Sequence, residues 1–417
     1  MSSTSDVGRI PKEFRYFENL SRPSVMRARK RFRLLFGFEP LLPDATIKAW
    51  ARSYYDADPV AEAFVEEVYL QKSQAEGRKL LDQALEQGVA SIPNAPRSLV
   101  QMMDEIEKRP AWVNWEQVKL GARVFRRYGP HVFSFAGAMT LEGYQENSVA
   151  KPLAFTGAYT GESAHKRFLE TAAFWIDVSN ENGLEKGGLG LKTALRVRMM
   201  HVFVRKRLLR HPEWNVEAWG VPISQGDAVL TLLVGSVVAG LALKTIGYRT
   251  SKAEIEAMMH FWRYVGHVMG VQPAYYPETF EDGLRLIFAS SCKSVRLAGE
   301  DGKNLAHSYL QSYAPKDSDK PMAYFRKALE YRLELGYTKH FLPGKTYRRY
   351  GLPNAGLWQL HPLAQFPFLF TLETLRRHHS LIDDMADHFA QWRSRQWLAR
   401  HLEKRAVQYR AVETFTR

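Results

Sequence analysis

The sequence predicts an all-α protein. Apolar residues recur at helical spacing through most of the chain, alternating strand-like runs are nearly absent, and glycine and proline clusters separate the helical stretches. The clusters are IPNAPRS, NGLEKGGLG, GVPISQGD and APKDSDKP. The spacing between them predicts helices at 45–53, 57–72, 75–87, 98–107, 115–127, 131–141, 164–178, 191–210, 226–246, 252–268, 278–293, 301–312, 321–334, 362–377 and 380–408.

The chain has 417 residues, which exceeds the length at which a single hydrophobic core usually stops growing, but no low-complexity linker divides it. We expect one large domain with helical extensions. The core is predicted at 100–300, the N-terminal extension at 1–99 and the C-terminal extension at 301–417. No repeat of fixed period is visible, so a solenoid is not expected.

The net charge of +14 is the unusual feature of the composition. Basic residues concentrate in RARKRFR at 27–33 and among the tryptophans and leucines of 393–410. Each stretch is typical of a solvated helical face, and each could also touch a membrane surface. No zinc-finger or RNA-binding signature accompanies them, so we expect no nucleic acid partner.

Cys292 is the only cysteine, which excludes an intrachain disulfide, a cysteine-cluster metal site and covalent attachment of haem. Any cofactor would be held non-covalently. The sequence MSSTSDVGRIPKEF has no apolar stretch behind a basic start, so we expect a cytoplasmic protein. The uncharged run at 228–243 is shorter than the roughly 20 residues that span a bilayer, and it predicts a buried central helix.

His201 lies in the middle of the predicted helix 191–210, in an apolar surround. Arg198 and Arg205 are three residues before and four after it, on the same side of a helix. This pattern suits a haem ligand with arginines near the propionates. The alternative is a core histidine beside solvated arginines.

A second polar group is predicted on the helix 164–178. Arg167, Glu170 and Thr171 stand at i, i+3 and i+4, so they share one helical face. A cation, a carboxylate and a hydroxyl together could sit above a bound oxygen species. The same pattern also occurs on ordinary surface faces.

Other metal and catalytic motifs fail on spacing. Glu162 and His165 form a single Glu-x-x-His, whereas a di-iron bundle needs two such pairs. His260 and His267 are two turns apart, too far to bind one metal together, and we interpret them as structural. The loop Gly187–Thr193 lacks the Gly-Lys-Ser/Thr end of a phosphate-binding loop, and there is no Gly-x-Ser-x-Gly elbow.

Several motifs in order resemble one family, the haem-b oxygenases that include the latex clearing proteins and the mycophenolic-acid-pathway oxygenase. The resemblance is carried by Arg167 with Thr171 and by the segments YQENSVAKPLAFTG, LRVRMMHVFVR, VPISQGD and HFWRYVGHVMGV. It implies a globin-like helical core, non-covalent haem b and His201 as the proximal iron ligand. It also implies a distal oxygen site at Arg167 and Thr171, with the propionates near Arg196, Arg198 or Arg205.

One position departs from the latex clearing proteins, which carry a lysine immediately before the distal threonine. Here that position is Glu170. Glu170 could act as a distal acid or base, or it could pair with Arg167; we favour the pairing. Glu142 and Glu146 are two unassigned candidates for the glutamate proposed as a catalytic base in that family.

The resulting hypothesis is a haem-b-dependent dioxygenase that acts with dioxygen on a carbon–carbon double bond of an apolar, terpenoid or polyisoprenoid-like molecule. One alternative is a haem peroxidase that uses Arg167 and Glu170 to split peroxide. A second alternative, from another class, is a haem-binding or lipid-binding protein without turnover.

Overall fold

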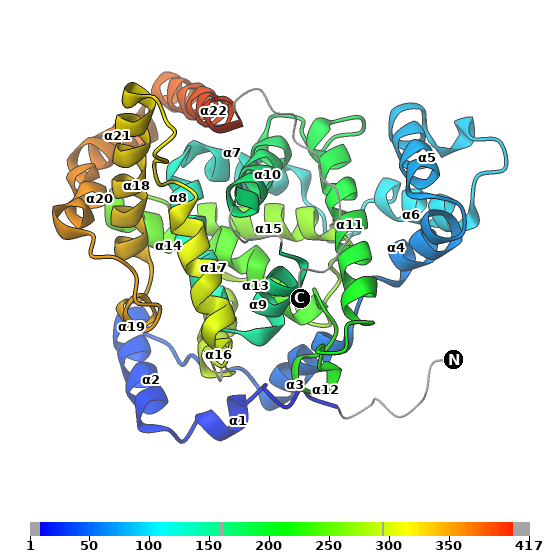
Figure 1. The fold of residues 1–417 in the computed structure, drawn as a ribbon, viewed down its shortest axis with the longest axis horizontal. Helices are drawn as coiled ribbons and strands as arrows, with labels where there is room; N and C mark the ends of the chain where they lie inside the picture. Colours follow the sequence, from blue (N-terminus) through cyan, green and yellow to red (C-terminus); the bar gives the residue numbers. More distant parts are fainter. Residues whose placement is uncertain (1–8, 158–161, 294–295, 403–417) are drawn as a thin grey trace.

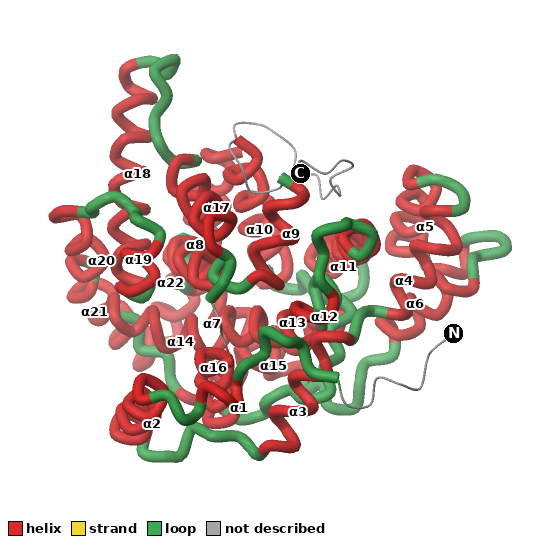
Figure 2. The backbone as a smooth tube through the Cα atoms, turned by 60° about the horizontal axis from the view of Figure 1, so that its bottom comes forward, coloured by secondary structure: helices red, strands yellow, loops and turns green. Residues whose placement is uncertain are grey.

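All regular elements in the described residues, 9–157, 162–293 and 296–402 of a computed structural model, are helical (Figures 1 and 2). The all-α prediction is therefore confirmed. The α-helices are α1 (Tyr16–Asn19), α2 (Pro23–Phe36), α3 (Asp44–Arg52), α4 (Pro59–Phe64), α5 (Gln74–Gln87), α6 (Arg97–Glu107), α7 (Trp115–Arg127), α8 (His131–Gly143), α9 (Asn147–Thr156), α10 (Glu162–Ser179), α11 (Leu189–Leu208), α12 (Val216–Trp219), α13 (Gln225–Leu233), α14 (Ala239–Ala242), α15 (Lys252–Val268), α16 (Phe280–Lys293), α17 (Gly299–Gln311), α18 (Pro321–Phe341), α19 (Gly344–Arg349), α20 (His361–Ala364), α21 (Phe366–His378) and α22 (Ser380–Leu402).

Shorter tight or wide helical turns join these helices. They are η1 (Ser53–Tyr55), η2 (Val65–Leu70), η3 (Val89–Ser91), η4 (Val234–Val238), η5 (Leu243–Ile246) and η6 (Gly356–Leu360), of which η2 and η4 are π-helical.

Capping residues explain where several helices begin. Ser251 and Glu254 form a reciprocal capping box at the start of α15. Asn114 accepts hydrogen bonds from two backbone N–H groups at the start of α7, and Pro23 occupies the first turn of α2. These side chains satisfy or remove donors that the first helical turn would otherwise leave without a partner.

The long periodic segments were predicted well. The ranges 164–178, 191–210 and 252–268 correspond to α10, α11 and α15. The predicted ranges omitted α9, which was wrong, and α2 was expected only as the helical face at 27–33. The apolar side of α2 is narrow within a very basic segment, and α9 contains Pro152, which the sequence rules treat as a helix breaker.

The helices α7 and α15 share the most extensive helix–helix contact in the described structure. They approach closely because Gly121 of α7 has no side chain. A Cβ atom at Gly121 would lie 2.1 Å from the carbonyl oxygen of Ala257. Phe125 and Trp262 complete the contact edge to face, with ring centroids 5.0 Å apart.

The apolar segment predicted as a central helix runs from α13 through η5, over Gln225–Ile246, and packs against α15. By length and composition it could cross a membrane, but half of its most apolar stretch is buried inside the protein. A buried core helix meets the same criteria, so this one helix is weak evidence for a membrane span.

The terminal parts flank the central helices on different sides. In Figure 1, α4, α5 and α6 lie to the right beside α11, whereas α18, α20 and α21 lie to the left. One cluster of buried apolar side chains nevertheless extends from Phe14 to Leu369. The extensions therefore share the core, while the predicted boundaries at 100 and 300 and the globin-like arrangement stay predictions.

We predict that Gly121→Ala lowers the free energy of unfolding by about 2 kcal/mol or more, because the new methyl group would overlap backbone atoms that cannot rotate away. Gly143→Ala is the matched control, since its Cβ would meet only Val149, at 3.6 Å. Urea unfolding followed by circular dichroism measures both. Equal midpoints for the two variants would contradict the close approach of α7 and α15.

Candidate functional site

His201 lies mid-way along α11 with a partly buried side chain, between the partly buried Met200 and the fully buried Val202. Burial, and then the positive charge of Arg205, lower the pKa of its imidazole to about 4. The ring is therefore neutral at pH 7. Within the described ranges its nitrogen atoms have no hydrogen-bond partner, since its interactions there are the charges of Arg205 and Asp58.

The antiparallel packing of α10 against α11 brings the two predicted groups to one level. The Thr193 hydroxyl donates a hydrogen bond of 2.9 Å to Asp177, which fixes the register of the two helices. Eight residues after Thr193 is His201, and eight residues before Asp177 is Leu169. The segment around Leu169 therefore lies level with His201.

This segment carries the predicted Arg167, Glu170 and Thr171. The Arg167 guanidinium donates to the Glu170 carboxylate at 2.6 Å, so the expected pairing is confirmed. The Thr171 hydroxyl donates to the Arg167 carbonyl at 3.0 Å. Burial raises the pKa of Glu170, and the charge of Arg167 opposes this rise. The arrangement supplies a cation, a hydroxyl and a carboxyl group that holds a proton more readily than usual.

Arg198 is almost fully buried and is neutralised by acidic residues from other helices. Its guanidinium binds both Asp58 oxygens, at 2.7 and 2.9 Å, and contacts Glu105 at 3.1 Å. Asp58 also caps α4 by accepting from the Ala61 N–H. The pair therefore ties α11 to α4 one turn before His201.

The other two predicted propionate partners also have protein acceptors. Arg205 donates to the Pro222 and Ile223 carbonyls and to Glu62, at 2.8 to 3.2 Å. Arg196 is more exposed and pairs with Asp82 at 2.7 Å. A role for these arginines in binding propionates stays a prediction, and it would require them to share or exchange these partners.

Asp58 and Glu105 were missed in the sequence analysis. Asp58 had a local signal, because an Asp before Pro59 is typical of a helix start. Its ion pair with Arg198 spans 140 residues and has no local signal.

The other candidate residues, Glu142, Glu146 and His260, each contact residues outside the group on α10 and α11. Glu142 faces Arg296 at 3.4 Å, and Glu146 faces Lys293 at 3.3 Å. Burial raises the pKa of Glu142. The His260 ring accepts a hydrogen bond of 2.8 Å from the Asn114 N–H, which agrees with a structural role. In the described part of the chain, no three His, Cys, Asp or Glu side chains gather where they could hold a metal ion.

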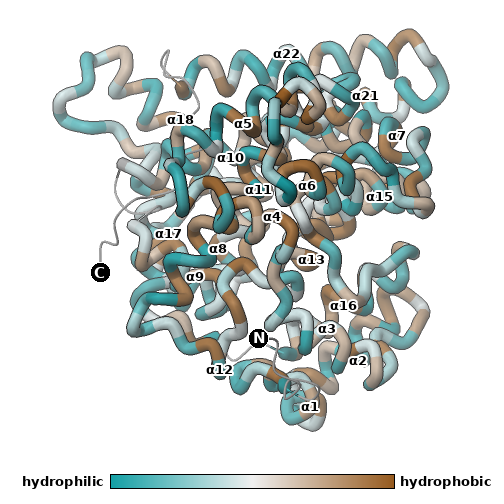
Figure 3. The backbone as a smooth tube through the Cα atoms, turned by 90° about the vertical axis from the view of Figure 1, so that its right-hand side faces the viewer, coloured by the Kyte–Doolittle hydropathy of each residue, from teal (hydrophilic) through white to brown (hydrophobic). Residues whose placement is uncertain are grey.

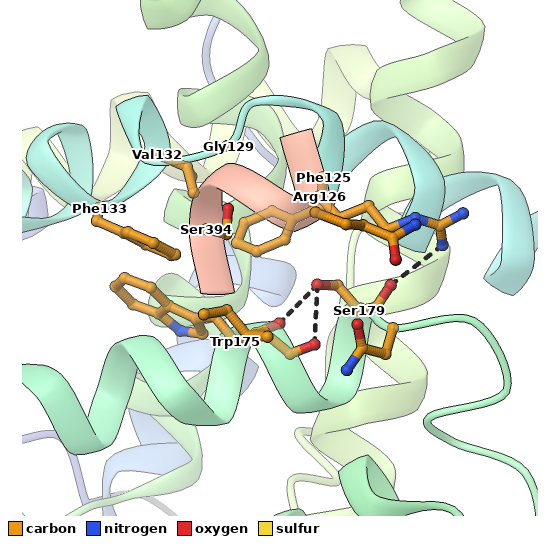
Figure 4. Close-up of a pocket in the computed structure, with 11 residues that line it drawn as sticks. Phe125, Arg126, Gly129, Val132, Phe133, Trp175, Ser179 and Ser394 are labelled. Carbon is orange, nitrogen blue, oxygen red and sulfur yellow. Dashed lines mark hydrogen bonds between the residues drawn. The ribbon is translucent and has the colours of Figure 1, made fainter. Parts of the chain in front are cut away.

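A small aromatic crevice lies between α7, α8, α10 and α22 (Figure 4). Phe133 stacks on Trp175 with centroids 6.1 Å apart, and Phe125 forms a second wall. Its polar side is supplied by Arg126, Ser179, Asn180, Gln391 and Ser394. Trp175 follows Thr171 by one helical turn, so the crevice adjoins the helix that carries the predicted oxygen site. The sequence analysis did not predict this crevice.

Comparisons with known proteins agree with this fold. A family model described as "ER-bound oxygenase mpaB/B'/Rubber oxygenase, catalytic domain" matches residues 125–377. A rubber oxygenase from Streptomyces sp. (strain K30) is 28% identical over 233 residues, which cover 54% of this chain and 55% of that protein. The chain thus matches about half the length of this relative.

A solved structure, "Structure of Latex Clearing Protein LCP in the closed state", is similar in fold, with a TM-score of 0.59 and 18% sequence identity. The match covers 82% of this chain and 91% of that chain. At this identity the likeness concerns the fold alone.

We predict that Asp58→Asn lowers the free energy of unfolding by about 3 kcal/mol, because it removes a charge partner from a buried guanidinium while keeping the helix cap. Asp82→Asn is the matched control: Asp82 lies on α5, but its partner Arg196 is on α11, as Arg198 is. The pair of Asp82 with Arg196 is about one-third exposed on each side, so its loss costs below about 1 kcal/mol. Urea unfolding measures both, and equal losses would show that the Asp58 pair does not anchor α11.

Proposed function

Because the chain belongs to the family of ER-bound oxygenases mpaB/B' and rubber oxygenases, as its motifs predicted, we propose that it is a haem-b-dependent dioxygenase. Its substrate is an apolar molecule with a carbon–carbon double bond, of terpenoid or polyisoprenoid-like character. The observation that carries the proposal is the position of His201, a neutral imidazole level with Arg167, Glu170 and Thr171.

The donor set at His201 fits a haem. Iron takes a neutral imidazole nitrogen, and the pKa of about 4 keeps this ring neutral across the physiological range. The single cysteine, Cys292, is buried and cannot form a paired covalent attachment. Bound haem b would supply the redox chemistry that activates dioxygen, with His201 as its protein ligand.

The residues of α10 would orient and polarise the oxygen. Arg167 contributes a cationic guanidinium, and Thr171 has a hydroxyl that can turn from the Arg167 carbonyl toward a ligand. The raised pKa of Glu170 allows its carboxyl group to hold or release a proton closer to neutral pH. With a glutamate in the place of the family lysine, a lysine-capped resting state is not expected.

An apolar substrate agrees with the aromatic crevice beside α10. The buried rings of Phe125 and Phe133 line it together with Trp175, which lies one turn from Thr171, and Arg126 lies at its side. The crevice has room for about one water molecule, so its side chains would have to move apart to admit an alkene.

A haem peroxidase is the second candidate, and the Arg167–Glu170 pair favours it. A buried carboxyl group beside a guanidinium could move a proton between the two oxygens of peroxide. Activity toward an alkene with dioxygen, and then with peroxide, as sole oxidant distinguishes the two functions.

We predict that His201→Ala loses bound haem, because its iron ligand is removed. The absorbance ratio of the Soret band to the protein band, measured after expression with haem supplied, gives the haem content. His260→Gln is the control, since His260 lies on α15 and contacts Asn114. Equal haem content in wild type and His201→Ala would refute the ligand assignment, whatever the activity.

We predict that Thr171→Ala keeps haem but lowers the rate of oxygenation by about a hundredfold, because an oriented donor is lost. Oxygen uptake with a terpenoid alkene measures the rate.

Thr140→Ala is the matched control for this change. Thr140 is also partly buried, and its hydroxyl also donates to the carbonyl four residues earlier, but it lies on α8. Similar rates for Thr171→Ala and Thr140→Ala would remove Thr171 from the oxygen site. Turnover with peroxide but not with dioxygen in the wild type would favour the peroxidase.

A further inference from the structure

Exposed apolar side chains concentrate in the C-terminal helices. Of the 24 exposed large hydrophobic residues in the described part of the chain, 15 lie between Met322 and Trp392. Single exposed apolar residues are common on proteins, but a concentration of this kind marks a surface that binds something.

The helix α22 carries the most regular part of this surface. Leu381, Met385, Phe389 and Trp392 are 77%, 71%, 52% and 56% exposed. They stand at i, i+4, i+8 and i+11, so they form one stripe along the helix, which we call the outer ridge. The opposite side packs on the protein through residues such as Ala390. α22 lies at the top edge of the molecule in Figures 1 and 3.

The acidic residues of α22 are neutralised from within the protein. Asp383 and Asp384 both bind Arg123 of α7, at 2.7 and 2.6 Å. Asp387 is buried and binds Arg126 at 2.6 Å. Asp383 and Asp387 therefore face the body of the protein, whereas Asp384 is 57% exposed and is matched by Arg123 at the surface.

The basic residues of α22 lie toward solvent. Arg393, Arg395 and Arg400 are exposed, and the described helix has no acidic residue after Asp387. The Arg393 guanidinium lies 5.9 Å from the centroid of the Phe389 ring, on the ridge itself. The outer ridge is therefore an apolar stripe with a tryptophan and flanking arginines.

We propose that the outer ridge docks the protein on an anionic lipid membrane. A helix of this kind lies in the interface with its apolar side chains among the acyl chains and its arginines at the head groups. The charge argues for lipid, since the ridge is cationic and the whole chain has a net charge of +14. A second copy of the chain would bring the same positive charges together.

The docking surface would place the proposed oxygenase at its substrate, so its biological purpose rests on the proposed function. An apolar alkene partitions into bilayers, so an enzyme held on the membrane would meet its substrate there. α22 lies beyond residue 377, where the family match ends, so the proposal concerns a feature of this chain outside the matched region.

Flotation of the full-length protein with lipid vesicles tests the proposal. We expect binding to phosphatidylcholine vesicles that contain phosphatidylserine, weaker binding without phosphatidylserine, and release by high salt. The double variant Met385→Ser with Phe389→Ser should bind at least about tenfold more weakly. The control, Leu34→Ser with Leu35→Ser, removes two even more exposed residues from the basic helix α2 and should bind like wild type.

A second measurement keeps the test valid if the double variant folds poorly. Brominated acyl chains quench tryptophan fluorescence on contact, and Trp392→Phe should lose part of this quenching while binding vesicles as wild type does. Absence of wild-type binding, equal binding by the double variant, or unchanged quenching in Trp392→Phe would overturn the proposal. So would a wild-type dimer that does not bind vesicles and that the double variant dissociates.

None of these measurements uses haem or substrate. A failed flotation therefore does not contradict the proposed oxygenase function, and an inactive enzyme does not contradict the docking surface.

Discussion

The buried ion pair between Arg198 and Asp58 holds the centre of this structure together. A guanidinium is costly to bury unless its donors are matched, and here two carboxylate oxygens match it at 2.7 and 2.9 Å. Asp58 starts α4, Arg198 belongs to α11, and Gly270 follows α15. A Cβ atom at Gly270 would lie 2.1 Å from Asp58, and its φ of +75° also favours glycine. Three segments distant in sequence therefore meet one turn from His201.

Burial shifts the pKa values of His201 on α11 and Glu170 on α10 in opposite directions. Burial and Arg205 lower the pKa of His201, so the ring stays neutral and able to bind a metal. Burial raises the pKa of Glu170, although Arg167 opposes it. A base that stays unprotonated and an acid that keeps its proton more readily thus lie at the same level of the α10 and α11 pair. Such a separation of titration behaviour is typical of functional sites.

Local spacing was enough to predict part of this site. The i and i+3 positions predicted the Arg167–Glu170 pair, and the helical period predicted that His201 lies mid-helix, because both depend on residues within one helix. The same reasoning placed Arg198 and Arg205 near the propionates, because they share one side of the helix with His201. Their observed acceptors, such as Asp58 and Glu62, are about 140 residues away, and only the tertiary fold brings them close. α9 was missed for a related reason, because a local rule treats proline as a helix breaker, whereas Pro152 is buried inside this helix.

Helix α22 connects the surface of the molecule with its interior. Its inner side supplies Ser394 to the aromatic crevice, while its outer ridge faces solvent two residues earlier, at Trp392. The crevice is shared with Trp175 of α10, which also carries Thr171. A helix with one polar side and one apolar side normally turns the apolar side toward the core of the protein. Here the inner side is fixed by Asp383 and Asp387, so the apolar side is held outward by ion pairs rather than left exposed by loose packing.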